Sequence, residues 1–140
     1  MAKTSELEAL FRATTYRVFL PGGYCDLRIG QPNAVLGAWL ETAGCGQYAI
    51  ITAYNPGGEL APADKNAARQ AQLECDLLEG NYEPYAGENV ADDADWPVEE
   101  SCFVADLAPE DACALAEDYG QSAVVCGDAD GVPQLVWIEK

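Results

Sequence analysis

The sequence has 140 residues, the size of one ordinary domain, and 49% of them are hydrophobic, which is enough for a packed core. It has 24 acidic residues against 7 Lys and Arg, and its formal net charge is −17. No apolar run approaches the roughly 18 residues that a membrane-spanning helix needs. The first residues carry Glu6 and Glu8 rather than the apolar core of a signal peptide. We therefore expect a single acidic domain over residues 1–140 that works in the cytoplasm and contacts no membrane.

The acidic charge is concentrated in the second half of the chain. Residues 1–69 contain six acids and six bases, whereas residues 70–139 contain eighteen acids and no Lys or Arg. Binding to a nucleic-acid backbone requires clustered Lys and Arg, so the sequence argues against it for this half. We interpret the acidity mainly as a solubility feature. Docking onto a basic protein partner and imitation of nucleic acid are the alternatives.

Six cysteines are present without the spacing of a metal site. They are separated by at least ten residues, no C-x-x-C pair occurs, and the chain contains no histidine. Zinc sites normally combine closely spaced thiols and imidazoles. We therefore expect no metal and no cofactor, and we expect most of the cysteines to be buried as small hydrophobic residues.

The expected elements of the first half follow from alternation, turn residues and caps. Apolar residues alternate over 16–20 and 25–29, and Pro21-Gly22-Gly23 between them predicts a hairpin. Asn33 is a suitable cap for the helix that follows. In chain order we expect a helix at 7–13, strands at 16–20 and 25–29, a helix at 34–42, and an apolar central strand at 48–54.

The second half combines a long helix, an acidic segment and a final pair of strands. Glycine, proline and aspartate disfavour regular structure over 82–98, apart from a candidate strand near 82–85. In chain order we expect a helix at about 62–78, this irregular segment, a strand at 100–107, a helix at 109–119, and strands at 122–126 and 134–138. Hairpins at both ends favour an α+β fold, in which helices pack on a mixed or mostly antiparallel sheet.

The segment Thr52-Ala53-Tyr54-Asn55-Pro56-Gly57-Gly58, which we call the TAYNP loop, is the main candidate for a functional site. The helix after it carries Asn66, Gln70, Leu73 and Leu77 at spacings of four, three and four, so these residues share one inward face. Two buried amides need hydrogen-bond partners, which loop backbone, other side chains or a ligand could supply. A strand end, a glycine-bearing loop and a helix start commonly form a ligand site. The alternative is that these residues only tie the loop to the helix.

Glu99 and Glu100 are a second candidate. A carboxylate here could act as a general acid or base, or hold a divalent cation. Adjacent residues of an extended chain point to opposite sides, so at most one of the two can face a given site. The alternatives are a solvated acidic pair, and pairing of an inward carboxylate with Arg28.

An ordered set of short segments resembles the bacterial family designated domain of unknown function 3293 (DUF3293), over nearly the whole chain. The segments are Ala13-Thr14-Thr15-Tyr16-Arg17, Leu27-Arg28-Ile29-Gly30, Ile51-Thr52-Ala53-Tyr54-Asn55-Pro56, Asn66 through Gln70 to Leu73, Trp96-Pro97-Val98-Glu99-Glu100-Ser101 and Gly120-Gln121-Ser122-Ala123. The resemblance implies a bacterial, cytoplasmic, single-domain protein and no particular mechanism. The loop has Asn55-Pro56-Gly57-Gly58 where we expect Asn-Pro-x-Ser in the family, so the resemblance implies no role for a loop hydroxyl.

Our leading hypothesis is that a polar or anionic small ligand, or a protein partner, binds at the TAYNP loop and the following helix. The expected ligand-binding residues are Arg28, Thr52, Asn55, Asn66, Arg69, Gln70 and Glu100. One alternative is an enzyme that uses Glu99 or Glu100 as an acid or base beside Arg28. Another is an interaction protein that docks its acidic half onto a basic partner.

Overall fold

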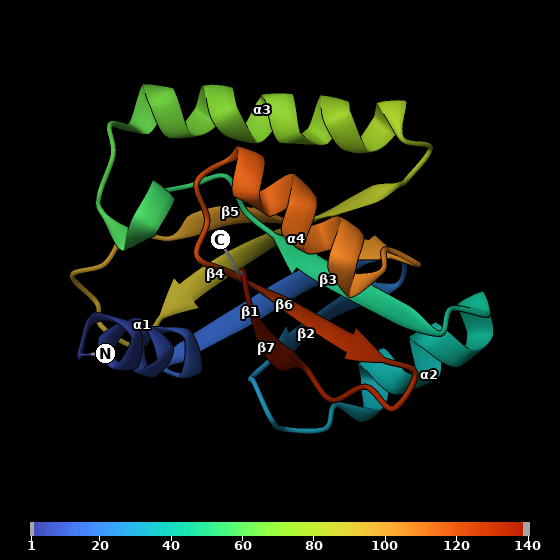
Figure 1. Cartoon of the computed structure of the whole chain (residues 1–140). Helices are drawn as coiled ribbons and strands as arrows, with labels where there is room; N and C mark the ends of the chain where they lie inside the picture. The colour runs from blue at the N-terminus through green and yellow to red at the C-terminus, as the bar shows by residue number, and fades with distance from the viewer. Residues whose placement is uncertain (1, 139–140) are drawn as a thin grey trace.

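Seven antiparallel strands form one curled sheet in the computed structural model, which describes residues 2–138 (Figure 1). The order of the strands across the sheet is β2-β1-β4-β5-β3-β6-β7. The strands are β1 (Thr14–Leu20), β2 (Gly23–Leu27), β3 (Gln47–Ile51), β4 (Pro84–Ala91), β5 (Glu99–Ala105), β6 (Ala123–Asp128) and β7 (Gln134–Trp137).

Helices cover both faces of this sheet. Within residues 2–138 they are α1 (Ala2–Arg12), α2 (Ala34–Ala43), α3 (Ala63–Glu79) and α4 (Pro109–Asp118), with the short 3-10 turn η1 (Pro56–Gly58). α3 and α4 pack on one face and α2 packs on the other, while α1 lies beside the start of β1 and the end of β4 (Figure 1). None of the described helices is both long enough and apolar enough to cross a membrane.

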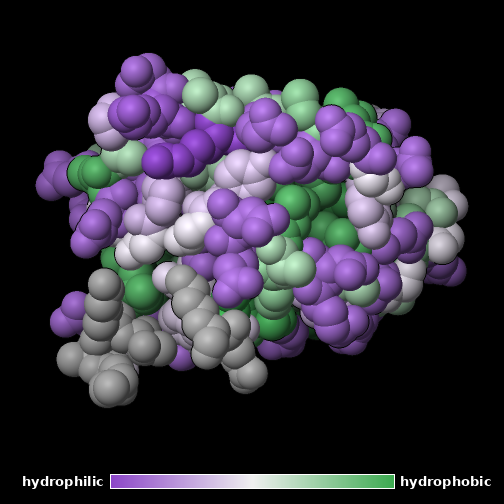
Figure 2. Space-filling model, turned by 45° about the horizontal axis from the view of Figure 1, so that its top comes forward, coloured by the Kyte–Doolittle hydropathy of each residue, from purple (hydrophilic) through white to green (hydrophobic). Residues whose placement is uncertain are grey.

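Alternation along the central strands sends side chains into two cores. On the α2 side, Leu36 and Leu40 pack with Tyr48 and Phe103, whose rings stack with their centroids 5.3 Å apart. The core on the opposite face joins α3 and α4 to β3, β5 and β6. Hydrophilic residues predominate on the outer surface that Figure 2 shows. The sheet is therefore buried on both faces at its centre, and a site on it must lie where helix cover ends.

The structure confirms the α+β class, and every strand pair in the sheet is antiparallel. The inward stripe of the long helix is also confirmed, because Asn66, Gln70, Leu73 and Leu77 are its buried residues. The side chain of Asn33 caps α2 as expected, since its Oδ1 accepts a hydrogen bond from the backbone of Leu36. The other expected elements are present with shifted ends.

The candidate strand near 82–85 corresponds to the start of β4 (Pro84–Ala91), and the prediction of irregular structure is wrong for the rest of this strand, which lies in the middle of the sheet. Gly87 shows the physical reason. A Cβ built there would lie 2.7 Å from Ser101 Oγ and 2.8 Å from the carbonyl oxygen of Arg17. Glycine at this position therefore allows β4 to lie close to both of its neighbours, β1 and β5, and does not break the strand.

Candidate functional site

The TAYNP loop is held from behind by two amides of α3. Gln70 Oε1 accepts a hydrogen bond from the Ala53 N–H at 2.9 Å, and Asn66 Oδ1 accepts one from the Asn55 N–H at 2.9 Å. Asn66 and Gln70 are each 4% exposed. Strand β3 ends at Ile51 because the following backbone groups pair with these side chains instead of with the sheet.

Asn55 connects Asn66 of α3 to Glu99 of β5. Its backbone is left-handed, with φ of 47°, a conformation that asparagine tolerates better than most residues. Asn55 Oδ1 accepts from Asn66 Nδ2 at 2.8 Å and from the Ala61 N–H at 2.9 Å. Asn55 Nδ2 donates to Glu99 Oε2 at 2.7 Å. The loop therefore orients a donor toward a carboxylate of β5.

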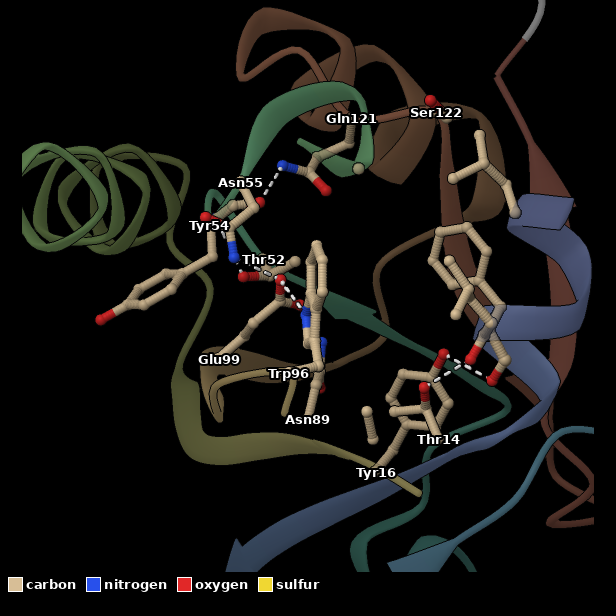
Figure 3. A pocket seen from close by; sticks show the side chains of 15 residues that line it. Thr14, Tyr16, Thr52, Tyr54, Asn55, Asn89, Trp96, Glu99, Gln121 and Ser122 are labelled. Atoms are coloured by element: carbon tan, nitrogen blue, oxygen red, sulfur yellow. Dashed lines mark hydrogen bonds between the residues drawn. The ribbon is translucent and has the colours of Figure 1, made fainter. Parts of the chain in front are cut away.

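A pocket with a cavity volume of about 90 Å³ lies at this point, between α1, the TAYNP loop and the end of the sheet (Figure 3). Its apolar side comes mainly from α1 through Leu7, Leu10 and Phe11. Its polar side comes from the sheet and the loops through Tyr16, Asn55, Asn89, Glu99 and Gln121. This is the end of the sheet that α2 does not cover.

Strand register builds the polar side. Tyr16 of β1 is directly opposite Asn89 of β4, and Asn89 is directly opposite Glu99 of β5. Directly opposite residues of antiparallel strands point to the same face with Cβ atoms about 4.5–5.5 Å apart. The three side chains therefore form one row across the floor of the pocket.

Glu99 is the half-buried carboxylate of this row. Its Oε2 accepts from Asn55 Nδ2 and from the Trp96 indole Nε1 at 3.3 Å, so Oε1 receives neither of these bonds. Burial raises the pKa of the Glu99 carboxyl, and hydrogen bonding by Asn55, Trp96 and Asn89 offsets part of the rise. Burial, followed by the charge of Glu99, also raises the pKa of the Tyr16 hydroxyl, which therefore keeps its proton.

Asn89 and Gln121 contribute further amide groups to the pocket. Asn89 is 9% exposed, and its Oδ1 is buried without a hydrogen-bond partner among residues 2–138. Gln121 donates through Nε2 to the Tyr54 carbonyl at 3.0 Å and turns its amide oxygen toward the pocket (Figure 3). The hydroxyls of Thr14 and Tyr16 already donate to backbone carbonyls of α1.

The sequence-predicted residues fall into three groups. Thr52 and Asn55 line the pocket, whereas Asn66 and Gln70 lie behind the loop and bind its backbone. Glu100 points away, to the exposed side, where its Oε2 accepts from the Tyr54 hydroxyl at 2.5 Å. Burial and this bond raise the pKa of that hydroxyl to about 12.

The two arginines lie outside the pocket lining. Arg28 forms an ion pair with Asp92, at 2.9 Å from Nη1 and 3.1 Å from Nη2, and Nη1 also donates to Thr15 Oγ1. Arg69 is half-buried on α3, and its Nη1 has no hydrogen-bond partner among the described residues. The expected group of seven residues is thus divided between the pocket, its support and separate parts of the surface.

Several lining residues were not among the expected ligand-binding residues. Glu99 was considered as an acid or base, as a cation ligand or as a partner of Arg28, but not as a ligand-binding residue. Asn89 was assigned to an irregular segment, which concealed its place opposite Glu99. Tyr16 follows the alternation of β1, but only the register across three strands puts it beside the other two. In residues 2–138 no group of three or more Cys, Asp or Glu is arranged to hold a metal ion.

The fold and the pocket define a single-domain α+β protein with a polar site at one end of an antiparallel sheet. The chain belongs to the family described as "Protein of unknown function (DUF3293)", which it matches over residues 51–124, more than half of its length. The expected membership of this family is therefore confirmed, with a match over this segment rather than over nearly the whole chain. The matched segment contains the TAYNP loop, Asn89, Glu99 and Gln121, while α1 lies outside it. No curated protein and no solved structure matches the chain.

Proposed function

We propose that the protein binds a small polar molecule in the pocket beneath α1. The observation that carries this proposal is the buried Asn89 Oδ1, which has no partner among the described residues and lies in the row that contains Glu99. An unsatisfied buried polar atom costs about 1–3 kcal/mol. A ligand that donates a hydrogen bond to it would offset this cost.

The surrounding geometry supports a specific site. Asn55 and Trp96 fix one oxygen of Glu99, and Asn66 fixes Asn55 in turn, so the carboxylate is held before any ligand arrives. Preorganised polar groups beside apolar walls are typical of small-molecule sites. A volume of about 90 Å³ exceeds the roughly 10–15 Å³ that one water requires and suits a few non-hydrogen atoms.

The charge of the lining favours a ligand that is not anionic. Among the residues whose side chains the structure describes, neither Lys nor Arg lines the pocket, and Arg28 is already paired with Asp92. An anion would therefore meet Glu99 without a compensating cation. Of the polar and anionic ligands expected from the sequence, we retain the polar class.

The proposal is tested by screening small polar compounds against ¹⁵N-labelled protein. The reporter is the indole N–H resonance of Trp96, assigned from its loss in Trp96→Phe. A compound that binds here shifts this resonance in a saturable way, and the shift is lost in Glu99→Gln. The matched control is Glu100→Gln, the neighbouring carboxylate on the other face, which keeps the binding. If every hit acts equally on both variants and leaves the Trp96 signal unmoved, the pocket is not the binding site.

A second candidate function is catalysis with Glu99 as a general acid or base. Its support is the raised pKa of the half-buried carboxyl, because proton transfer is most efficient when the pKa lies near the working pH. The test is to follow each bound compound by NMR over time. Turnover that wild-type protein performs and Glu99→Gln does not would support catalysis, and a bound compound that stays unchanged supports binding alone.

We infer in addition that the protein works in a bacterial cytoplasm. The six cysteines are all free thiols, three of them buried, which suits a reducing compartment. Fractionation of cells that express the tagged protein tests this: recovery with an extracytoplasmic marker would contradict it.

A further inference from the structure

We propose that the group recognised in this pocket is a primary alkylammonium. The inference depends on the proposed function, because it names the ligand class for the same site. It follows from three properties of the described lining: which hydrogen-bonding atoms are left over, which charge is unbalanced, and what shape the apolar side allows.

The first property is an excess of acceptors. Asn89 Oδ1 is buried and has no partner among the described residues, and the Gln121 amide oxygen faces the cavity. Glu99 has about four lone-pair positions for the three side chains, Asn55, Trp96 and Asn89, that hydrogen-bond to it. An ammonium group has three donors and no acceptor. A carboxylate or phosphate ligand has the opposite pattern and would leave these oxygens unsatisfied.

The acceptors are also close enough to serve one nitrogen. Asn89 and Glu99 are directly opposite each other on β4 and β5, so their Cβ atoms are about 4.5–5.5 Å apart. The Tyr16 hydroxyl does not compete for these acceptors, since it donates to the Phe11 carbonyl at 3.1 Å. The two side chains therefore lie next to each other in the lining of the pocket.

The second property is an unpaired negative charge. The ion pairs of the described residues join Arg12 to Glu8, Arg17 to Asp26 and Arg28 to Asp92, and none includes Glu99. A half-buried carboxylate without a cation is costly, because burial removes part of its hydration. A cationic ligand would supply the missing charge, and the net charge of −17 would attract it to the protein.

The third property is the apolar side formed by α1. Leu7, Leu10 and Phe11 lie across the cavity from the polar row, and Leu10 is 48% exposed at the rim. A short alkyl chain attached to the nitrogen would lie against these side chains. The volume of about 90 Å³ limits that chain to a few carbons inside the pocket, and a longer chain would project into solvent.

The test is an NMR titration of the full chain with three probes of equal length: n-butylammonium, n-butanol and n-butanoate, at pH 7.5 and matched ionic strength. We expect n-butylammonium to shift the Trp96 indole resonance in a saturable way, n-butanol to bind at least tenfold more weakly, and n-butanoate not to bind. Glu99→Gln should weaken n-butylammonium at least tenfold, and Glu100→Gln should change it less than twofold.

A second variant, Asn89→Leu, removes the unpartnered acceptor without changing the charge, and it should also weaken n-butylammonium. Melting curves identify any variant that is unfolded, and the probe series on wild-type protein does not depend on variants. If n-butanol or n-butanoate binds as well as n-butylammonium, the ammonium inference is overturned while binding in the pocket stands. If none of the three moves the Trp96 signal, the inference is again overturned, and the compound screen decides the proposed function separately.

Discussion

Asn55 Nδ2 donates to Glu99 Oε2 at 2.7 Å, while Oδ1 of the same amide accepts from Asn66 Nδ2 at 2.8 Å. One asparagine therefore joins the first turn of α3 to the carboxylate of the pocket. The loop is both a structural connection and a part of the site, because the two ends of one side chain perform the two tasks. This arrangement separates effects on stability from effects on binding.

Asn66→Ala should lower the free energy of unfolding by about 1–3 kcal/mol, because it leaves the buried Asn55 N–H without an acceptor. Urea denaturation measures the change. The control is Gln72→Ala on the same helix, where the lost bond to Asp76 is exposed, and the expected change is within about 0.5 kcal/mol. Equal effects from the two variants would mean that Asn66 does not hold the loop.

Gly87→Ala should destabilise the protein by about 1–3 kcal/mol, because the added Cβ would overlap Ser101 Oγ and the Arg17 carbonyl oxygen. Thermal and urea unfolding both report this change. Gly46→Ala is the control, since a Cβ at Gly46 has nothing within 4 Å. A stable Gly87→Ala protein with unchanged β4 amide protection would contradict the close packing of β4 against its neighbours β1 and β5.

The sequence was sufficient for the fold class and for the buried stripe of α3, because alternation and helical spacing are local patterns. Most of β4 was missed because its stability comes from pairing with a strand on each side, and strand preference depends strongly on such context. The polar row of the pocket was missed for a related reason: Tyr16, Asn89 and Glu99 meet only through strand register. Docking of the acidic half onto a basic partner stays a prediction.

The same dependence on long-range contacts applies to the two amides of α3. Their inward direction followed from spacing, but whether they faced a ligand or the loop backbone depended on where the loop lay. Residues 52–55 could not be positioned against α3 from local signals, because the loop leaves the sheet to form those contacts. Sequence alone thus left a pocket and a structural connection as alternatives, and Asn55 takes part in both.

Glu99→Gln should stabilise the ligand-free protein at neutral pH. The pKa of the Glu99 carboxyl is raised on folding, so the folded state favours the neutral form, and ionisation at higher pH costs stability. The glutamine has the same shape and can still accept from Asn55 and Trp96. The gain should be largest above the raised pKa and should disappear as the pH falls below the ordinary pKa of a glutamate. Melting temperatures from pH 3.5 to 8 measure it, and a lower melting temperature for Glu99→Gln at pH 7 would contradict the prediction.

Arg28→Gln should leave n-butylammonium binding within twofold of the wild-type value, because the guanidinium is engaged with Asp92 and lies outside the pocket lining. The ion pair is largely exposed to solvent, so its loss should change the melting temperature only slightly. The hydrogen bond from Arg28 lowers the pKa of Asp92, so this small stabilisation is lost as the pH falls through the lowered pKa. A large loss of affinity in Arg28→Gln would instead show that Arg28 takes part in binding.

The affinity for n-butylammonium should depend on pH through Glu99. The amine stays charged well below its own pKa, so across acidic and neutral pH only the carboxyl changes its charge in the pocket. Binding should be constant while Glu99 is ionised and should weaken as the pH falls through its raised pKa, by up to tenfold per pH unit once the carboxyl is mostly protonated. Glu99→Gln should bind weakly at every pH, and Glu100→Gln should follow the wild-type curve. A wild-type affinity that does not change between pH 4 and pH 8 would exclude the ionised Glu99 as the group that binds the cation.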